Sequence, residues 1–229
     1  MRPVDGSLVL LMSGESRRNG TRAIDLSRFK NDGTVYGAIW RRVSPHCSGL
    51  SFDGVDDYVE VADNESLHIV KELTVAVWVK FNSLGAKDVL CAKFQSGKYD
   101  WLWWVDNTYP DELRFYPGSD SYKGWTTNAN LQTGLWYHAV VVYDGNGSTN
   151  QEKLRIYING EAKDMDYYGT LSASLPAYSI PVHIGDNPGN PYSPSQLNGL
   201  IGEVRIYNRA LSGAEISALY STRKHLYGG

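Results

Sequence analysis

The densest group of side chains with binding chemistry lies between residues 99 and 109, where three tryptophans and two tyrosines stand among acidic and amide residues. Aromatic rings cover the apolar C–H faces of sugars, while carboxylate, amide or guanidinium groups pair with the hydroxyls. On a β-strand, residues two apart share a face, so Tyr99, Trp101 and Trp103 point one way and Leu102 and Trp104 point the other. One set must therefore face the core, and the other lies on a sheet surface or lines a groove.

More side chains of the same chemistry follow between residues 114 and 125. A sheet that places Tyr116 and Trp125 beside Trp101 or Trp103 would form a platform for a glycan. We predict a ligand-binding set that comprises Trp101, Trp103, Arg114, Tyr116, Tyr122 and Trp125. Two other interpretations stay open: that most of these rings belong to the core, and that an exposed patch of them contacts a protein.

Catalytic chemistry has weaker support. Glycoside hydrolysis needs two carboxylates at a set separation, and the nearest candidates are Glu60, Asp63 and Glu65. Glu60 and Asp63 are three residues apart, so on a strand they would point to opposite faces, and Asp63 begins a turn. We therefore interpret these carboxylates as solvated charges. His138 and His183 lie in predicted strands, where we interpret each as a core or surface histidine. With no phosphate loop or zinc-ligand spacing either, we predict no catalytic residues.

The overall composition excludes several classes of protein. The formal net charge of −3 is too small and of the wrong sign for a nucleic-acid footprint. No apolar stretch approaches the roughly 18 residues that span a bilayer, so we expect no membrane insertion. The apolar run Leu8–Met12 is too short for a signal-peptide core, so export requires a leader or a larger polyprotein outside this sequence.

Short alternating apolar runs between turn signals predict about twelve strands and an all-β fold. Leu73–Phe81 alternates clearly, Trp136–Tyr143 is apolar throughout, and Thr34–Trp40 is predicted as one strand. Asn159-Gly160, at the end of the alternating run Leu154–Ile158, is a strong hairpin signal. The only cysteines, Cys47 and Cys91, are either one disulfide or two buried thiols.

One helix is predicted at the C-terminal end. Ser212 and Glu215 have the spacing of a capping box, and Leu211 and Ile216 that of a hydrophobic staple, which predicts a helix running to about Tyr220. No linker divides the chain and no internal repeat is visible. We therefore predict a single domain over residues 1–229.

Four segments, in this order, resemble the laminin-G-like (LamG) domains of the concanavalin A-like lectin/glucanase superfamily. They are "AIDLSRFKNDGTVYGAIW" (23–40), "GLSFDGVDDYVEVADNESLHIVKELTVAVWVKF" (49–81), "WYHAVVVYDG" with "LRIYINGE" (136–161), and "LIGEVRIYNRALSGAEISALY" (200–220). The resemblance implies a two-sheet antiparallel jelly-roll β-sandwich with one short C-terminal helix. It also implies that the first and last strands pair.

The same resemblance implies a structural Ca²⁺ near the paired terminal strands, a position for hard oxygen ligands. The matching residues are Asp25, Asn31 and Glu203, but Gly202 stands where the family commonly has Asp. The alternative is that Asp25, with Ser27 and Asp32, builds an Asx-type turn. A second acidic cluster at Asp53, Asp56 and Asp57 is interpreted as a hairpin turn.

A fold does not determine a function, so three functions are carried forward. The leading prediction is a non-catalytic recognition module of a secreted or surface-exposed protein, with carbohydrate as its ligand class. The alternative is a structural or adhesion domain that contacts protein in a cell-surface or virion assembly. The second alternative is a glycoside hydrolase or polysaccharide lyase of the same fold.

Overall fold

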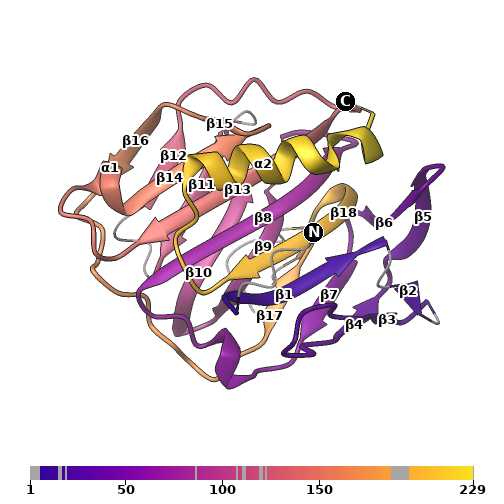
Figure 1. Ribbon diagram of the computed structural model, residues 1–229, viewed down its shortest axis with the longest axis horizontal. Coiled ribbons are helices and arrows are strands. Elements are labelled where there is room, and N and C mark those ends of the chain that lie inside the picture. Colours follow the sequence, from indigo (N-terminus) through magenta and orange to yellow (C-terminus); the bar gives the residue numbers. More distant parts are fainter. Residues whose placement is uncertain are drawn as a thin grey trace.

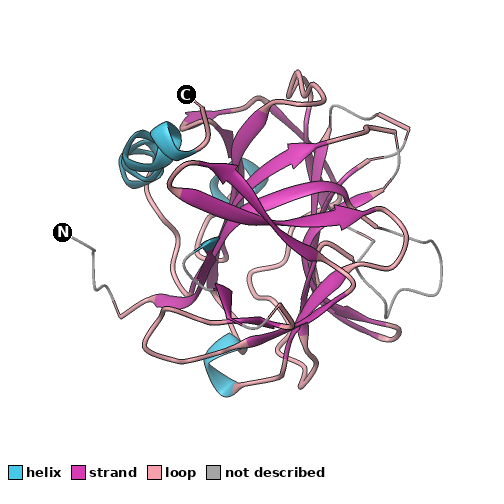
Figure 2. Cartoon of the chain, turned by 90° about the vertical axis from the view of Figure 1, so that its right-hand side faces the viewer, coloured by secondary structure: helices cyan, strands magenta, loops and turns pink. Residues whose placement is uncertain are grey.

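The computed structural model describes residues 6–14, 17–18, 20–85, 87–106, 108–109, 112–118, 121, 123–186 and 196–228, with the backbone alone at 17–18. Within these ranges the strands form two antiparallel sheets that face one another (Figures 1 and 2). The predicted two-sheet antiparallel β-sandwich is therefore confirmed. No helix in the described ranges is long and apolar enough to cross a membrane.

The sheet that we call sheet A has, in its described part, eight strands in the order β15-β14-β13-β8-β18-β6-β5, with β1 also paired to β18. The pairing of β1 with β18 confirms the expected contact between the first and last strands. Its strands are β1 (Leu8–Ser13), β5 (Ile39–Ser44), β6 (Cys47–Asp53), β8 (Glu72–Phe81), β13 (Trp136–Asp144), β14 (Leu154–Ile158), β15 (Glu161–Ala162) and β18 (Asn198–Tyr207).

The opposite sheet, sheet B, has ten described strands in the order β16-β12-β11-β10-β9-β17-β7-β4-β3-β2. They are β2 (Arg17–Arg18), β3 (Arg22–Ala23), β4 (Gly33–Tyr36), β7 (Tyr58–Val61), β9 (Asp88–Gln95), β10 (Lys98–Val105), β11 (Leu113–Pro117), β12 (Lys123–Thr126), β16 (Met165–Tyr168) and β17 (Val182–Ile184). The described helical elements are η2 (Glu65–Leu67), α1 (Asn150–Lys153), α2 (Gly213–Arg223) and η3 (Lys224–Leu226).

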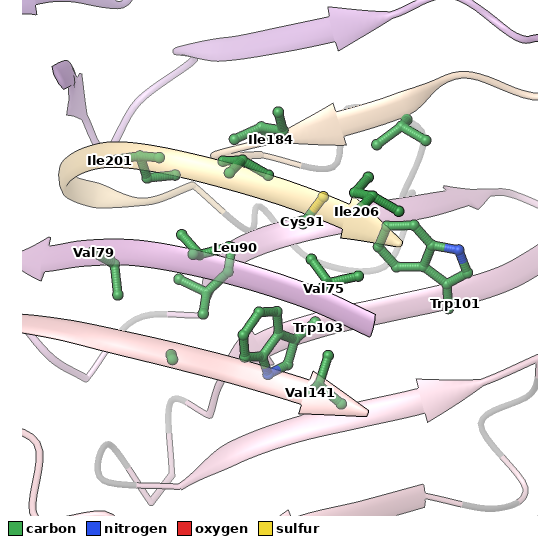
Figure 3. Packing of buried hydrophobic residues seen from close by; sticks show 14 of the residues in the cluster. Val75, Val79, Leu90, Cys91, Trp101, Trp103, Val141, Ile184, Ile201 and Ile206 are labelled. Carbon is green, nitrogen blue, oxygen red and sulfur yellow. The ribbon is translucent and has the colours of Figure 1, made fainter. Parts of the chain in front are cut away.

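The core lies between the two sheets because each strand turns alternate residues toward the other sheet. Figure 3 shows Val75 and Val141 from sheet A packed near Trp103 from sheet B, with Trp101 and Ile206 beside them. Cys91 is buried in this core, whereas Cys47 lies on β6 near the hydroxyl of Tyr227. The two cysteines therefore do not form a disulfide with each other.

The C-terminal helix begins where the capping signal predicts. The Ser212 hydroxyl accepts from the backbone N–H of Glu215, and the Glu215 carboxylate accepts from the N–H of Ser212, so both parts of the capping box are present. Leu211 and Ile216 pack in one apolar cluster on the outer face of sheet A. The helix thus covers that face, and it extends to Arg223, slightly beyond the predicted end.

The strand predicted over residues 34–40 is two strands, β4 in sheet B and β5 in sheet A. The chain changes sheets at Gly37, which has a φ of 71°. A Cβ at this position would lie 1.9 Å from Oδ1 of Asp57, so both the backbone conformation and the available space require glycine. Apolar and aromatic residues continue on both sides of Gly37, which explains why the pattern predicts one strand.

Candidate functional site

The outer face of sheet B is the broad face that helix α2 leaves open. Figure 2 shows α2 against the outside of one layer, with no comparable helix against the outside of the other layer among the described residues. Four of the large, exposed aromatic side chains are tyrosines carried by sheet B or by its neighbouring loops, namely Tyr36, Tyr109, Tyr168 and Tyr178. Tyr36 on β4 lies toward the opposite end of the strand order from Tyr168 on β16, so the four rings do not form one group. Exposed amphipathic rings that gather with other side chains indicate a contact surface.

Strand pairing lines up a first row of side chains across this face. Trp104 of β10 lies opposite Arg114 of β11, Arg114 lies opposite Trp125 of β12, and Trp125 lies opposite Asp166 of β16. Directly opposite residues on neighbouring strands point to the same side of a sheet. Three consecutive strands and the distant strand β16 therefore place two indole rings, a guanidinium group and a carboxylate in one line.

A second row runs beside the first, two residues along each strand. Leu102 lies opposite Tyr116, and Lys123 lies opposite Tyr168. The Nζ atom of Lys123 donates to the Tyr116 hydroxyl at 3.3 Å and lies 5.0 Å from the centre of that ring and 5.7 Å from the centre of Tyr168. The ammonium group of Lys123 thus lies between two tyrosine rings.

Arg114 has the same arrangement in the first row. Its guanidinium carbon lies 5.7 Å from the ring centre of Tyr109 and 5.5 Å from that of Trp125. Its nitrogens also pair with Glu112 at 2.8 Å and with Asp106 at 3.2 Å. Asp106 in turn accepts backbone hydrogen bonds from Thr108 and Tyr109. The guanidinium group thus contacts both the Tyr109 and the Trp125 ring while it pairs with two carboxylates.

We call the resulting surface the aromatic patch, which comprises Tyr109, Arg114, Tyr116, Lys123, Trp125 and Tyr168. Tyr109 is 54% exposed and Tyr168 is 59% exposed, while Trp125 and Tyr116 are half-buried. Trp104 lies beneath them, only 4% exposed and edge-on to Tyr116 with ring centres 4.1 Å apart. The patch can therefore present ring faces to the apolar side of a ligand and hydroxyl or ammonium groups to its polar side.

The structure brings together three of the predicted ligand residues, Arg114, Tyr116 and Trp125. Trp101 and Trp103, predicted for the same surface, instead lie in the core between the sheets, 2% and 0% exposed (Figure 3). That prediction is wrong because β10 turns the other set, Leu102 and Trp104, outward. Tyr122 lies outside the described residues.

Tyr109, Lys123 and Tyr168 belong to the patch but were not predicted. Trp104, which lies beneath the patch, belongs to the set of residues that was not predicted to bind ligand. One feature of the sequence does indicate which set points outward. The next residue in the set of Leu102 and Trp104 is Asp106, whereas the next residue in the other set is the apolar Val105. A charged residue at the end of one set favours solvent for that face. Tyr168 had no such signal, because it joins the patch through the pairing of distant strands.

The predicted calcium ligands are only partly brought together. The buried carboxylate of Asp25 accepts four hydrogen bonds of 2.6–2.8 Å, from the backbone of Leu11, Ser27 and Asn31 and from the Ser27 hydroxyl. The bond from the Ser27 N–H forms the Asx-type turn that was the alternative interpretation. The side-chain amide of Asn31 donates to Val9 and Ser66.

Glu203 lies apart from this turn. Its carboxylate pairs with Arg205 at 2.6 Å and with Arg223 of α2 at 3.1 Å, so it links β18 to the C-terminal helix. Asp53, Asp56 and Asp57 are, within the described ranges, the one group of three or more acidic, histidine or cysteine side chains close enough to share an ion. In this group Asp57 accepts from the backbone of Asp53 within a turn. The turn connects β6 of sheet A to β7 of sheet B, so the predicted hairpin is wrong.

Ca²⁺ binding near Asp25 therefore stays a prediction, and thermal unfolding tests it. An ion that binds the native state alone must raise its stability. The prediction requires the melting temperature to fall when EDTA is added and to recover when Ca²⁺ is restored in excess. A melting temperature that does not change when EDTA is added would contradict the prediction that Ca²⁺ stabilises this fold.

The carboxylates considered for catalysis bond to different histidines. The Glu60 carboxylate lies 3.3 Å from the imidazole of His183, and that of Asp63 lies 2.9 Å from the imidazole of His68. Burial lowers the pKa of His183. His138 packs near Trp78 and Tyr220 under α2, where burial lowers its pKa to about 3.

A buried lysine occupies the end of the core near Asp63. The register between β9 and β10 shifts at Asp100, an extra residue whose carboxylate lies 2.8 Å from the ammonium group of Lys93. Lys93 also donates to the carbonyl of Tyr178 and lies 3.8 Å from Asp63. The ammonium group thus donates two hydrogen bonds, to Asp100 and to Tyr178, and forms a longer ion pair with Asp63.

Comparison with known proteins agrees with this fold. The botulinum-like toxin eBoNT/J of Enterococcus sp. (strain 3G1_DIV0629) is 23% identical in an alignment 184 residues long, which covers 72% of this chain and 13% of the toxin. The binding domain of Paraclostridial Mosquitocidal Protein 1 superposes with a TM-score of 0.71 at 16% identity, over 98% of this chain and 56% of that one.

A sialidase of Trypanosoma rangeli superposes with a TM-score of 0.69 at 19% identity, over 98% of this chain and 34% of that one. This chain therefore spans only part of each of these proteins, and structural likeness at such identity shows the fold alone. A family model described as the concanavalin A-like lectin/glucanases superfamily (Laminin_G_3) matches residues 53–217. That match covers more than half of the sequence, and the chain therefore belongs to the concanavalin A-like lectin/glucanase superfamily.

Proposed function

We propose that this chain is a non-catalytic recognition module that binds carbohydrate through the aromatic patch. The observation that carries the proposal is the arrangement of two cations between rings, Arg114 between Tyr109 and Trp125, and Lys123 between Tyr116 and Tyr168. Each cation contacts two rings before a ligand binds, which reduces the ordering that binding requires and so favours affinity. Exposed ring faces beside hydroxyl and ammonium groups match the two chemical sides of a sugar.

The state of the carboxylates supports binding in preference to hydrolysis. A glycosidase needs one carboxyl group to give a proton and another to attack or to activate water. In the patch, Glu112 and Asp106 are both paired with Arg114, and Asp106 also accepts two backbone hydrogen bonds. Both carboxylates are thereby engaged inside the protein, with the guanidinium group of Arg114 and, for Asp106, with backbone N–H groups as well.

The relatives support a role as one module of a larger secreted or surface protein. One resembles this chain over a small part of a botulinum-like toxin, and another is named as a binding domain. We propose that this chain likewise works outside the cell or at a surface, where a sugar or a surface protein is within reach. The sialidase superposition covers a third of that enzyme, so it adds no catalytic residues to the proposal.

Replacing Trp125 with alanine is expected to weaken glycan binding at least about tenfold, which corresponds to ~1.4 kcal/mol for the loss of one aromatic anchor. A glycan array followed by titration of the best ligand measures this effect. Ile39→Ala is a matched control, because Ile39 is also a large exposed residue but lies on β5 of sheet A. Equal losses in the two variants would remove the patch as the binding site.

A blank array from correctly folded protein would contradict the carbohydrate proposal. The same exposed tyrosines and Trp125 would then favour the alternative, a structural or adhesion domain that contacts a protein, because tyrosine, tryptophan and arginine are also the common anchors of protein interfaces. Capture of purified surface proteins by the wild-type chain, but not by Trp125→Ala, would support that alternative.

A further inference from the structure

We propose that the ligand of the aromatic patch is an uncharged sugar chain, and that acidic sugars are disfavoured. This inference rests on the proposed function and names the ligand class of the same site. It follows from the charges on and beside the patch. Two groups are positive, Arg114 and Lys123, and three are negative, Asp106, Glu112 and Asp166. The described surface therefore carries one net negative charge.

Arg114 has little capacity left for an acidic ligand. Arginine recognises carboxylate and sulfate-like groups by donating two parallel N–H bonds. Here Nε and Nη2 both donate to Glu112, at 3.2 Å and 2.8 Å, and Nη1 pairs with Asp106. The rings of Tyr109 and Trp125 lie near the guanidinium group as well. Three of its five N–H groups are thus engaged with internal carboxylates, and an acidic sugar that approached the guanidinium group would meet the like charges of Glu112 and Asp106.

Lys123 is the other cation, and its surroundings favour hydroxyl groups. Its ammonium group already donates to the Tyr116 hydroxyl and lies between the rings of Tyr116 and Tyr168. The exposed carboxylate of Asp166 stands on the neighbouring strand, opposite Trp125 and two residues from Tyr168. A carboxylate or sulfate bound over Trp125 would meet this like charge. Like charges brought together at an interface oppose binding.

Hydroxyl groups fit all of these neighbours. Asp166 can accept a hydrogen bond from a sugar hydroxyl, Lys123 can donate one, and the tyrosine hydroxyls can do either. Binding of this kind draws on ring stacking and neutral hydrogen bonds, so its affinity is expected to change little with ionic strength. Binding of an acidic sugar to a lysine would weaken as salt screens the attraction.

The test uses the full chain and pairs of glycans that share one core and differ only by a terminal sialic acid or a sulfate. We expect the uncharged member of each pair to bind at least about fivefold more tightly, with less than about a twofold change between ~50 and ~500 mM NaCl. Preference for the acidic member, with affinity that falls as salt rises, would overturn this inference and leave the proposed function standing. If folded protein binds neither member, both are overturned.

A charge-reversal variant gives a second, independent measurement. Asp166→Lys is expected to move the ratio of acidic to uncharged binding at least about fivefold toward the acidic member, because it replaces the opposing charge with an attractive one. Glu65→Lys is the matched control, because it makes the same change of charge at an exposed residue of η2 and should leave the ratio unchanged. This helix follows β7, which lies five strands away from β12 in sheet B. Equal ratios in Asp166→Lys and the wild type would contradict the role given to Asp166.

Discussion

Replacing Lys93 with methionine is expected to lower the free energy of unfolding by about 3–5 kcal/mol, because it leaves a buried carboxylate without its partner. Lys93 is fully buried and Asp100 nearly so, and their charged atoms lie 2.8 Å apart. The carboxylate of Asp100 would retain the backbone hydrogen bond from Tyr178 at 3.0 Å, which cannot replace an ammonium group. Urea denaturation of the two proteins measures the difference.

The decrease in unfolding free energy caused by Lys93→Met should depend on pH. Burial already raises the pKa of Asp100, and Lys93 acts in the opposite direction. Without Lys93 the pKa of Asp100 in the folded protein rises further above its unfolded value. A raised pKa favours the folded state at low pH, and that advantage is lost as pH rises through it. The deficit of Lys93→Met should therefore be smaller at pH 5 than at pH 8.

Two further variants separate the buried charge from the loss of a long side chain. Lys93→Met combined with Asp100→Asn should be more stable than Lys93→Met alone, because asparagine keeps an acceptor for the Tyr178 N–H without a charge. Lys71→Met is the matched control: Lys71 also donates to a carbonyl of the segment before β17, that of Ala173, but it is exposed. It should lose no more than about 0.5 kcal/mol. Similar losses at Lys71 and Lys93 would contradict the argument.

Replacing Trp103 with alanine should destabilise the protein by about 3–5 kcal/mol, through lost burial and the cavity that remains. The ring lies between the sheets near Val75 and Val141 (Figure 3), and its indole N–H has no hydrogen-bond partner. Trp103→Phe should therefore lose clearly less than Trp103→Ala, since it removes part of the volume and no hydrogen bond.

Trp125→Ala provides the comparison on the outer face. Trp125 is half-buried on β12, so its removal should change the unfolding free energy by less than about 1 kcal/mol while it weakens ligand binding. Urea midpoints of Trp103→Ala and Trp125→Ala, measured together, test the assignment of the two rings to different faces. Equal stability of the two variants would show that Trp103 does not lie in the core.

Features that depend on neighbours in the chain could be predicted from the sequence. The capping box of α2 needs only Ser212 and Glu215, three residues apart. The hairpin between β14 and β15 needs only Asn159 and Gly160, which adopt φ values of 53° and 84° at the turn. Local signals of this kind hold wherever the segment lies in the fold.

The change of sheet at Gly37 could not be predicted from local sequence. Glycine tolerates a positive φ, but nothing in residues 34–40 says that the chain must leave one sheet for the other. The decisive neighbour is Asp57, twenty residues further along the chain. The predicted calcium ligands show the same limit. Asp25 and Asn31 are close in sequence and meet within one turn, whereas Glu203 pairs with Arg223, a residue that only the packing of α2 against the sheet brings near.

For the binding face, the sequence by itself determined the chemistry and the partition of rings into two sets. Alternation along a strand separates Trp101 and Trp103 from Leu102 and Trp104, but period two is symmetric and does not say which set is inside. Only the packing of sheet A against one side of β10 decided that, and it buried Trp101 and Trp103. Likewise, the strand order β10-β11-β12-β16 placed Tyr168 beside Lys123 and Trp125, because side chains on a sheet meet through register between strands.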